Sequence, residues 1–148
     1  MDASGNSLSR ILIVDDDPDF LAIAEASLAA LGFVVERASG GLRGVFLATQ
    51  RAPDAILCDL RMPGIDGFVV AEALRADAAT CHAAIFACTG RHDLQVRARM
   101  RDSAFDGVLL KPVDWADAVH LIEDAIRRRS AGDAPAVRGQ AASLRDRK

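Results

Sequence analysis

Polar and charged side chains follow four of the apolar runs of this sequence, and their types suggest phosphoryl-transfer chemistry. Three acidic residues, 15–17, follow the first run, Asp59 ends the third, Thr89 follows the fourth and Lys111 follows the fifth. Clustered carboxylates repel one another unless they share a cation, and a site lined by hard oxygen ligands suits Mg²⁺ with several retained waters. The acidic residues therefore predict a divalent-metal site.

The same residues could form and sense an aspartyl-phosphate. A carboxylate such as that of Asp59 can attack phosphorus when a metal and a fixed ammonium neutralise the crowded oxygens, and Lys111 supplies the ammonium. The hydroxyl of Thr89 can donate a hydrogen bond to a phosphoryl oxygen and so report its presence. Helix capping explains any one acid, such as Asp17 before Pro18, but it explains neither the extra acids nor the lysine.

The strands and helices expected to carry these residues alternate along the chain. Apolar, β-prone runs predict five strands, at residues 10–14, 33–37, 55–59, 84–88 and 107–110. Helical spacing predicts five helices, at about residues 18–31, 40–52, 67–77, 92–102 and 115–129, with N-caps at Asp17, Ser39, Asp66 and Asp114. This alternation implies an α/β fold, with a parallel sheet, right-handed crossovers and helices on both faces. Such sheets bind ligands outside the carboxyl ends of their strands, so the polar residues should meet at one edge.

Apolar residues at helical spacing predict which face each helix buries. The first helix has Leu21, Ala24, Leu28 and Leu31, the second Leu42, Val45, Phe46 and Thr49, and the last Val119, Ile122 and Ile126.

Composition limits the class of protein. With 148 residues, of which 51% are hydrophobic and 26% charged, the chain is predicted to form one globular domain without room for a second catalytic or DNA-binding domain. It has neither a signal-peptide pattern nor an apolar stretch of about 20 residues, so we expect a cytoplasmic protein. Cys58 and Cys88 lie in apolar runs, which favours free thiols. The net charge of −3 combines an acidic body with a basic C-terminal tail, and the acidic body argues against nucleic-acid binding.

Taken together, these residues resemble the receiver domain of two-component response regulators. The resemblance spans about residues 10–129 and lies in the pair Asp15-Asp16, the segment 59–67, Thr89 and the pair Lys111-Pro112. It implies a flavodoxin-like, doubly wound (βα)5 fold, whose five-stranded parallel sheet has the strand order 2-1-3-4-5. With it we expect a flexible segment at residues 1–9, a receiver domain at 10–129 and a flexible basic tail at 130–148.

The resemblance also implies a metal site and a phosphoacceptor. Asp59 would be the phosphoacceptor, and Asp16, Asp59 and the backbone carbonyl of Arg61 would bind Mg²⁺ or Mn²⁺. Asp15 would act through a metal-bound water. A histidine kinase or a histidine phosphotransfer protein would donate the phosphoryl group, which makes the chain a signalling phosphoacceptor rather than a turnover enzyme.

The remaining site residues would detect the phosphoryl group on Asp59 and make its presence recognisable to a partner protein. Thr89 and Lys111 would contact the phosphoryl group, and in this family the peptide bond corresponding to Lys111-Pro112 is often cis. The changed surface would be read by a downstream protein in trans, and a dimer is left open.

Three positions bear on the readout and lifetime of the phosphoryl group. The family usually carries Tyr or Phe three residues before its lysine, and that ring moves inward when the threonine engages phosphate. Val108 stands there instead, and a valine has no ring to move, so the usual readout is in question. Arg61 and Arg91 occupy positions that flank the phosphoryl group in the family, and we hypothesise that they alter its lifetime.

Two other functions remain alternatives. Asp15-x-Asp17 after the first strand imitates the nucleophile and acid of haloacid-dehalogenase-type phosphatases, although Pro18 follows at once and a cap domain has no room. The second alternative is a receiver-like interaction module that works unphosphorylated. Val108 favours this alternative, because it lacks the ring that usually reports phosphorylation. The complete set of acidic site residues argues against it.

Overall fold

Five parallel strands form one sheet in the order β2-β1-β3-β4-β5, which confirms the predicted topology. The computed structural model describes residues 8–90, 98–100 and 104–132. The strands are β1 (Arg10–Asp15), β2 (Val34–Ser39), β3 (Ala55–Asp59), β4 (Ala84–Thr89) and β5 (Gly107–Leu110). The helices assigned within these ranges are α1 (Pro18–Ala30), α2 (Gly41–Arg51), α3 (Gly67–Ala76) and α5 (Trp115–Ser130). Of the helix predicted at about residues 92–102, residues 98–100 are helical, and the rest lie outside the described residues.

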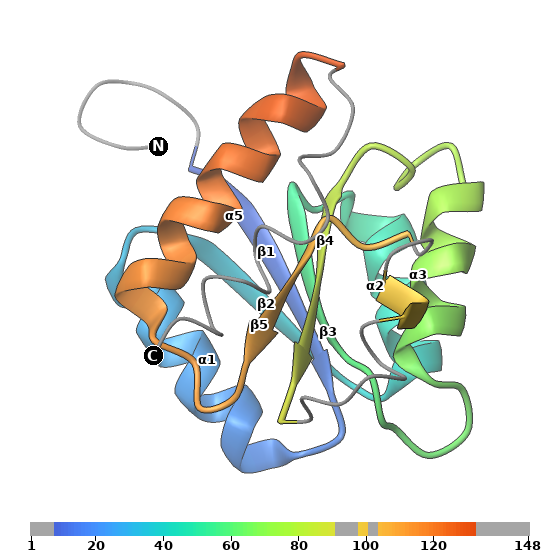
Figure 1. Ribbon diagram of the computed structural model, residues 1–148, viewed down its shortest axis with the longest axis horizontal. Coiled ribbons are helices and arrows are strands. Elements are labelled where there is room, and N and C mark those ends of the chain that lie inside the picture. The colour runs from blue at the N-terminus through green and yellow to red at the C-terminus, as the bar shows by residue number, and fades with distance from the viewer. Residues whose placement is uncertain (1–7, 91–97, 101–103, 133–148) are drawn as a thin grey trace.

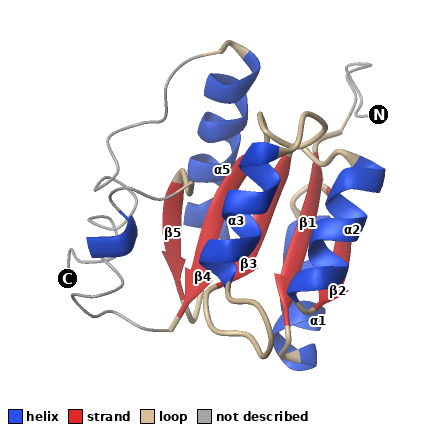
Figure 2. Cartoon of the chain, turned by 90° about the vertical axis from the view of Figure 1, so that its right-hand side faces the viewer, coloured by secondary structure: helices blue, strands red, loops and turns tan. Residues whose placement is uncertain are grey.

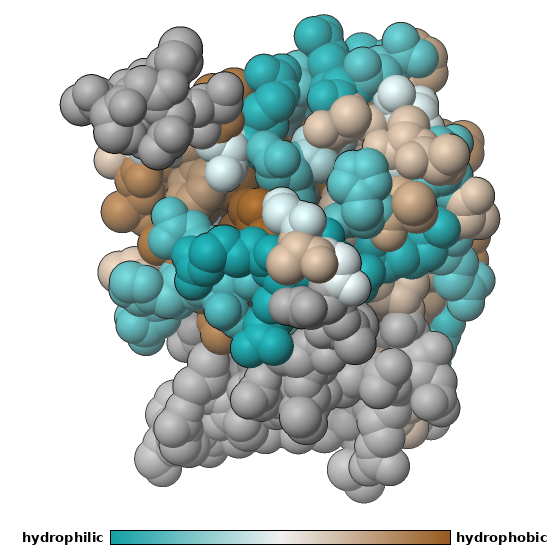
Figure 3. Space-filling model, turned by 90° about the horizontal axis from the view of Figure 1, so that it is seen from above, coloured by the Kyte–Doolittle hydropathy of each residue, from teal (hydrophilic) through white to brown (hydrophobic). Residues whose placement is uncertain are grey.

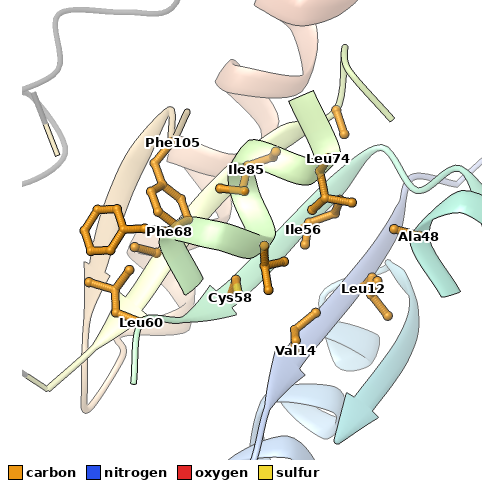
Figure 4. Close-up of a cluster of buried hydrophobic side chains, with 14 of the residues drawn as sticks. Leu12, Val14, Ala48, Ile56, Cys58, Leu60, Phe68, Leu74, Ile85 and Phe105 are labelled. Atoms are coloured by element: carbon orange, nitrogen blue, oxygen red, sulfur yellow. The ribbon is translucent and has the colours of Figure 1, made fainter. Parts of the chain in front are cut away.

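The helices cover both faces of the sheet, as the alternating pattern predicts. Helices α1 and α5 lie on one face and α2 and α3 on the other (Figures 1 and 2). Strands β3 and β4 are buried along their whole length, because each lies between two neighbouring strands and is covered on both faces. Alternate side chains of these strands enter two separate cores, of which the one under α2 and α3 contains Ile56, Ile85 and the edge-to-face pair of Phe68 and Phe105 (Figure 4).

Three of the four predicted N-caps are confirmed. Asp17, Asp66 and Asp114 each accept a hydrogen bond from a backbone N–H in the first turn of α1, α3 and α5, respectively. The prediction for Ser39 was wrong, because this residue continues β2, where it pairs with Asp15, and Gly40 is the N-cap of α2 without a side-chain hydrogen bond.

The buried face of α2 also differs from the prediction. Leu42 is 75% exposed and Phe46 is 52% exposed, whereas Gly41, Gly44 and Ala48 are buried. A Cβ atom on Gly44 would lie 2.7 Å from a methyl group of Val14, so the helix lies too close to the sheet for larger side chains. In the first helix Leu31 is the C-cap residue and is 46% exposed, so the buried stripe ends at Leu28.

A buried ion cluster lies at the end of the sheet where the strands begin. The Asp106 cluster consists of Arg75 at the end of α3, Asp106 just before β5, and Arg129 at the end of α5. Asp106 is 5% exposed in its side chain and accepts hydrogen bonds from Arg75 Nη2 at 2.9 Å, from Arg129 Nη2 at 2.6 Å and from the backbone N–H of Ile85 at 2.8 Å. The other guanidinium nitrogens of Arg75 donate to the backbone carbonyls of Cys81, Ala83 and Ala104.

The Asp106 cluster therefore joins two helices to the starts of two strands. Figure 3 views the molecule from this end, where hydrophilic residues cover a large part of the described surface. All three cysteines are free, with Cys58 and Cys88 buried, as predicted. No helix among the described residues is long and apolar enough to cross a membrane.

Candidate functional site

The carboxyl ends of β1, β3, β4 and β5 bring the predicted site residues to one edge of the sheet. Val14 pairs with Cys58, so the residues that follow them, Asp15 and Asp59, lie on neighbouring strands at the same level. Thr89 pairs with Leu110, and its backbone carbonyl accepts a hydrogen bond from the N–H of Lys111 at 2.9 Å. The parallel register therefore gathers residues that are up to 96 positions apart in the chain.

Three carboxylates form a compact acidic cluster at this edge. One oxygen each from Asp15, Asp16 and Asp59 lies within 4.8 Å of the others. Asp15 has no exposed surface, Asp59 is 9% exposed, and Asp16 faces solvent. Asp17 is used differently, because its side chain caps α1. We call Asp15, Asp16, Asp59 and Lys111 the acidic site.

Lys111 is the cation of the acidic site. Its Nζ lies 2.8 Å from Asp15 Oδ2 and 3.9 Å from Asp59 Oδ1. Burial alone would lower the pKa of the Lys111 ammonium, but the hydrogen bond and charge of Asp15, together with the charge of Asp59, outweigh burial and raise it. The ammonium is therefore held charged between the two carboxylates. The Lys111-Pro112 peptide bond is cis, as the resemblance implied.

Asp59 is placed by its own loop as well as by β3. Its Oδ1 accepts a hydrogen bond from the backbone N–H of Arg61 at 3.3 Å. The loop returns to the strand at Gly67, whose N–H donates to the carbonyl of Leu60, and a Cβ atom on Gly67 would collide with the backbone of Asp59. Only glycine allows this close approach, so Gly67 helps to fix the position of Asp59.

The electrostatic environment of Asp59 disfavours its charged form. Burial raises the pKa of the Asp59 carboxyl above its ordinary value, and the negative charge of Asp15 adds to this rise. The charge of Lys111 and the N–H of Arg61 oppose it without cancelling it. Asp59 is thus a carboxylate whose negative charge would be stabilised by a further cation.

The donor set fits a divalent metal ion. Three carboxylates and one ammonium leave these four groups with a formal charge of −2. Carboxylate oxygens are the ligands that hard cations such as Mg²⁺ prefer, and Asp16 and the 9% exposed Asp59 leave an approach from solvent. The acidic cluster is therefore suited to metal binding.

The remaining predicted residues differ in how close they lie to the acidic site. Thr89 ends β4 at the site edge and is 2% exposed. Val108 lies within β5, 6% exposed, and packs into the core under α2 and α3. Arg61 is exposed, and its backbone N–H donates a hydrogen bond to Asp59. Arg91 lies outside the described residues.

Sequence reasoning missed one neighbour of the site, Phe20. Its ring lies against Lys111, with 4.2 Å between Nζ and the ring centroid. Phe20 is the third residue of α1 and belongs to no run that ends at the site, so spacing alone gives no signal for it. The phenyl ring comes from α1 and the lysine follows β5, so only the folded arrangement brings the two side chains together.

Comparisons with known proteins agree with this arrangement. Residues 11–123 match the family model of the response regulator receiver domain. The DNA-binding dual master transcriptional regulator RpaA of Synechocystis is 35% identical over 121 residues, which are 82% of this chain and 50% of RpaA. The transcriptional regulatory protein PrrA of Mycobacterium leprae is 37% identical over 131 residues, which are 86% of this chain and 54% of PrrA. The chain thus spans about half the length of the curated relatives it matches.

Solved structures give the same picture. The receiver domain of the sensor histidine kinase PA1611 from Pseudomonas aeruginosa, which has a magnesium ion in its active site cleft, matches with a TM-score of 0.75 and 28% identity over 81% of this chain and 98% of that one. A putative response regulator from Chloroflexus aurantiacus matches with a TM-score of 0.77 and 27% identity over 82% of this chain and all of that one.

Proposed function

The chain belongs to the response regulator receiver domain family, and from that premise we propose that Asp59 accepts a phosphoryl group from the phosphohistidine of a histidine kinase or phosphotransfer protein. The observation that carries this proposal is the position of Lys111, whose ammonium lies between Asp15 and Asp59 at the edge where the acidic cluster is exposed to solvent. A nucleophilic carboxylate and a fixed cation are what transfer to an aspartate requires.

In the proposed step an oxygen of Asp59 forms a bond to phosphorus while the bond between phosphorus and the donor nitrogen breaks. The electron pair of the broken bond stays on the imidazole nitrogen, which takes a proton from solvent. Lys111 keeps its protons and lies close enough to Asp59 to neutralise charge on a phosphoryl oxygen. No general base is needed, because the attacking carboxylate carries no proton when ionised.

The acidic site would hold Mg²⁺ or Mn²⁺ through Asp16, Asp59 and the backbone carbonyl of Arg61, with Asp15 acting through a water. When bound, the ion supplies positive charge to the phosphoryl oxygens. The PA1611 receiver domain, which carries magnesium in its active site cleft, supports this assignment.

Thr89 would donate its hydroxyl to the phosphoryl group, since it ends β4 beside Lys111. Arg61 and Arg91 remain proposed modulators of the phosphoryl lifetime. Val108 is buried in the core, so we propose that the phosphorylated state is read without an aromatic side chain at this position. To test the two arginines, the dephosphorylation rates of Arg61→Ala and Arg91→Ala are compared with that of the wild type. Equal rates would rule out an effect of these arginines on the phosphoryl lifetime.

The proposed partners are a phosphodonor kinase and a downstream protein that reads the changed surface. We propose that the receiver domain spans residues 10–129 and that the protein works in the cytoplasm. Most of the two flanks, residues 1–7 and 133–148, lies outside the described residues. RpaA is described as DNA-binding, but the present proposal gives residues 10–129 no contact with nucleic acid. We propose further that the downstream protein that recognises the phosphorylated surface is a separate chain, acting in trans.

Two observations bear on the alternatives. The carboxylate of Asp17 accepts a hydrogen bond from the N–H of Asp19, and that of Asp15 accepts one from the N–H of Asp17 and binds Lys111. These contacts argue against Asp15 and Asp17 as the nucleophile and acid of a phosphatase. Buried Val108 leaves a phosphorylation-independent interaction module as the second candidate.

One experiment separates these functions. The protein is incubated with Mg²⁺ and acetyl phosphate, and the intact mass is measured with and without hydroxylamine, which cleaves acyl phosphates. The wild type should gain one phosphoryl group that hydroxylamine removes, while Asp59→Asn and a sample with excess EDTA should gain none. The proposal fails if the wild type gains none or if Asp59→Asn gains as much.

A further inference from the structure

The Lys111 ammonium has a third neighbour besides its two carboxylates. Nζ lies 4.2 Å from the centroid of the Phe20 ring, 2.8 Å from Asp15 and 3.9 Å from Asp59. The face of an aromatic ring carries negative electrostatic potential and attracts an ammonium. At this separation no water molecule fits between Nζ and the ring, so the ring both attracts the ammonium and removes solvent from one side of it.

We propose that Phe20 is a positioning residue that holds the Lys111 ammonium toward Asp59 during phosphoryl transfer. This inference rests on the proposed function of Asp59. Lysine has a long side chain with several rotatable bonds, and a fixed ammonium must be held by its surroundings. The three contacts surround Nζ from the start of α1, the end of β1 and the end of β3.

The ring matters because the two carboxylates are also the groups that a bound cation attracts. Asp15 makes the shortest contact with Lys111 and is at the same time a member of the acidic cluster. A divalent ion in that cluster competes with Lys111 for the oxygens of Asp15 and Asp59. Phe20 offers no oxygen ligand to the ion, so its contact with the ammonium does not compete with metal binding.

Phe20 is itself held in place by α5. Its ring centroid lies 6.0 Å from that of Trp115, with a tilt of 40° between the rings, and both rings pack against the core under α1 and α5. Trp115 is the first residue of α5, four positions after Lys111. The ammonium therefore contacts the phenyl ring, and the phenyl ring contacts the indole, which joins the acidic site to α1 and α5.

The test compares Phe20→Leu, which removes the ring but keeps an apolar side chain, with Phe20→Tyr, which keeps a ring. Leu21→Ala is the matched control, because Leu21 is the next residue of α1, is 4% exposed and points into the core rather than toward Lys111. Phosphorylation by acetyl phosphate is measured at saturating Mg²⁺. We expect Phe20→Leu to slow the reaction about tenfold, from the loss of one desolvated cation–π contact, and Phe20→Tyr to stay within about twofold of the wild type.

A second measurement does not depend on phosphorylation. Lys111 and Lys148 are the two lysines of the chain, so labelling lysine ε-carbons gives two signals in an NMR spectrum. The ring current of Phe20 should shift the Lys111 ε-proton signal upfield in the wild type and in Phe20→Tyr. The shift should disappear in Phe20→Leu and persist in Leu21→Ala.

The outcomes are distinguishable. A wild type that is not phosphorylated overturns the proposed function, while the lysine spectrum still decides whether Phe20 contacts Lys111. If the wild type is phosphorylated, the inference is overturned by a rate in Phe20→Leu equal to that of the wild type, by an equal slowing in Leu21→Ala, or by a Lys111 signal that does not respond to Phe20→Leu.

Discussion

At the carboxyl end of the sheet three carboxylates gather beside one ammonium, which contacts two of them, whereas at the amino end two guanidiniums share one carboxylate. In the Asp106 cluster each Asp106 oxygen accepts hydrogen bonds, and the guanidinium of Arg75 also donates to three carbonyls. The acidic site instead contains a carboxylate, Asp59, whose pKa is raised by burial and by Asp15.

The charges of the Asp106 cluster are paired and hydrogen-bonded, whereas the acidic site has an excess of negative charge. Buried charges are tolerated when they are paired and hydrogen-bonded, and such a cluster has no further use for a ligand. An excess of like charge costs stability until a ligand neutralises it, which couples the stability of the protein to the occupancy of the site. Four measurements test this contrast.

The largest effect should come from removing the shared carboxylate of the amino end. Asp106→Ala leaves the guanidiniums of Arg75 and Arg129 facing each other and the N–H of Ile85 unpaired, so we expect the free energy of unfolding to fall by about 3–5 kcal/mol. Urea denaturation measures it. Asp124→Ala is the control, because Asp124 pairs with Arg127 and Arg128 at the surface and should cost only about 0.2–1 kcal/mol. Equal losses in the two variants would contradict the contrast.

The second effect is stabilisation of the carboxyl end by metal. At a Mg²⁺ concentration ten times its Kd, the wild type should gain about 1.4 kcal/mol, because the ion binds the folded state. Thermal unfolding with and without Mg²⁺ measures this gain, and EDTA should reverse it. Asp59→Asn should respond much less, while Asp124→Ala should respond as the wild type does. A full response in Asp59→Asn would show that the ion binds elsewhere.

The third effect is the cost of the Asp59 charge without metal. Folding raises the pKa of Asp59, so the stability linked to its protonation is fully present below the unfolded pKa and is lost as the pH rises through the folded pKa. Asp59→Asn, which carries no charge, should therefore be more stable than the wild type at neutral pH, by about 0.5–2 kcal/mol. The difference should vanish below about pH 3.9. Unfolding curves at several pH values without metal measure it, and a less stable Asn variant at neutral pH would contradict the raised pKa.

The smallest effect concerns salt. Salt screens the repulsion between solvent-exposed Asp16 and Asp59, whereas the charges of the buried Asp106 cluster are screened much less. Between about 0.05 and 0.5 M NaCl, the advantage of Asp59→Asn should shrink by a few tenths of a kcal/mol, while the loss in Asp106→Ala should stay constant. Urea denaturation at both salt concentrations measures the stability gain of Asp59→Asn and the stability loss of Asp106→Ala. A loss in Asp106→Ala that falls with salt would mean that the cluster is more solvated than its exposure indicates.

Features of the fold set by local sequence could be predicted. Continuous apolar runs placed the five strands, and the short side chains of Asp17, Asp66 and Asp114 capped their helices because each is followed at once by a helical turn. Ser39 failed as a cap because the pairing of β2 with β1 extends to Asp15, which keeps Ser39 in the strand. A local pattern carries no information on that pairing.

Features set by distances between elements could not be predicted. Leu42 and Phe46 have the spacing of a buried stripe but are exposed. Helix α2 lies so close to Val14 that only small side chains fit on its inner face. The meeting of Asp15, Asp59 and Lys111 followed from the rule for strand ends, whereas the Asp106 cluster joins residues 31 and 23 positions apart without any motif. The contact of Phe20 with Lys111 likewise depends on where α1 starts in space.

The contact between Phe20 and Trp115 also gives the molecule an optical probe. Trp115 is the single tryptophan of the chain, so all indole fluorescence comes from one place, 6.0 Å from the ring that faces Lys111. Indole emission depends on nearby charges and on the rings packed against it, so a displacement of the Lys111 ammonium should change its intensity or wavelength. Occupancy of the acidic site could then be followed in real time, in dilute solution and without an attached dye.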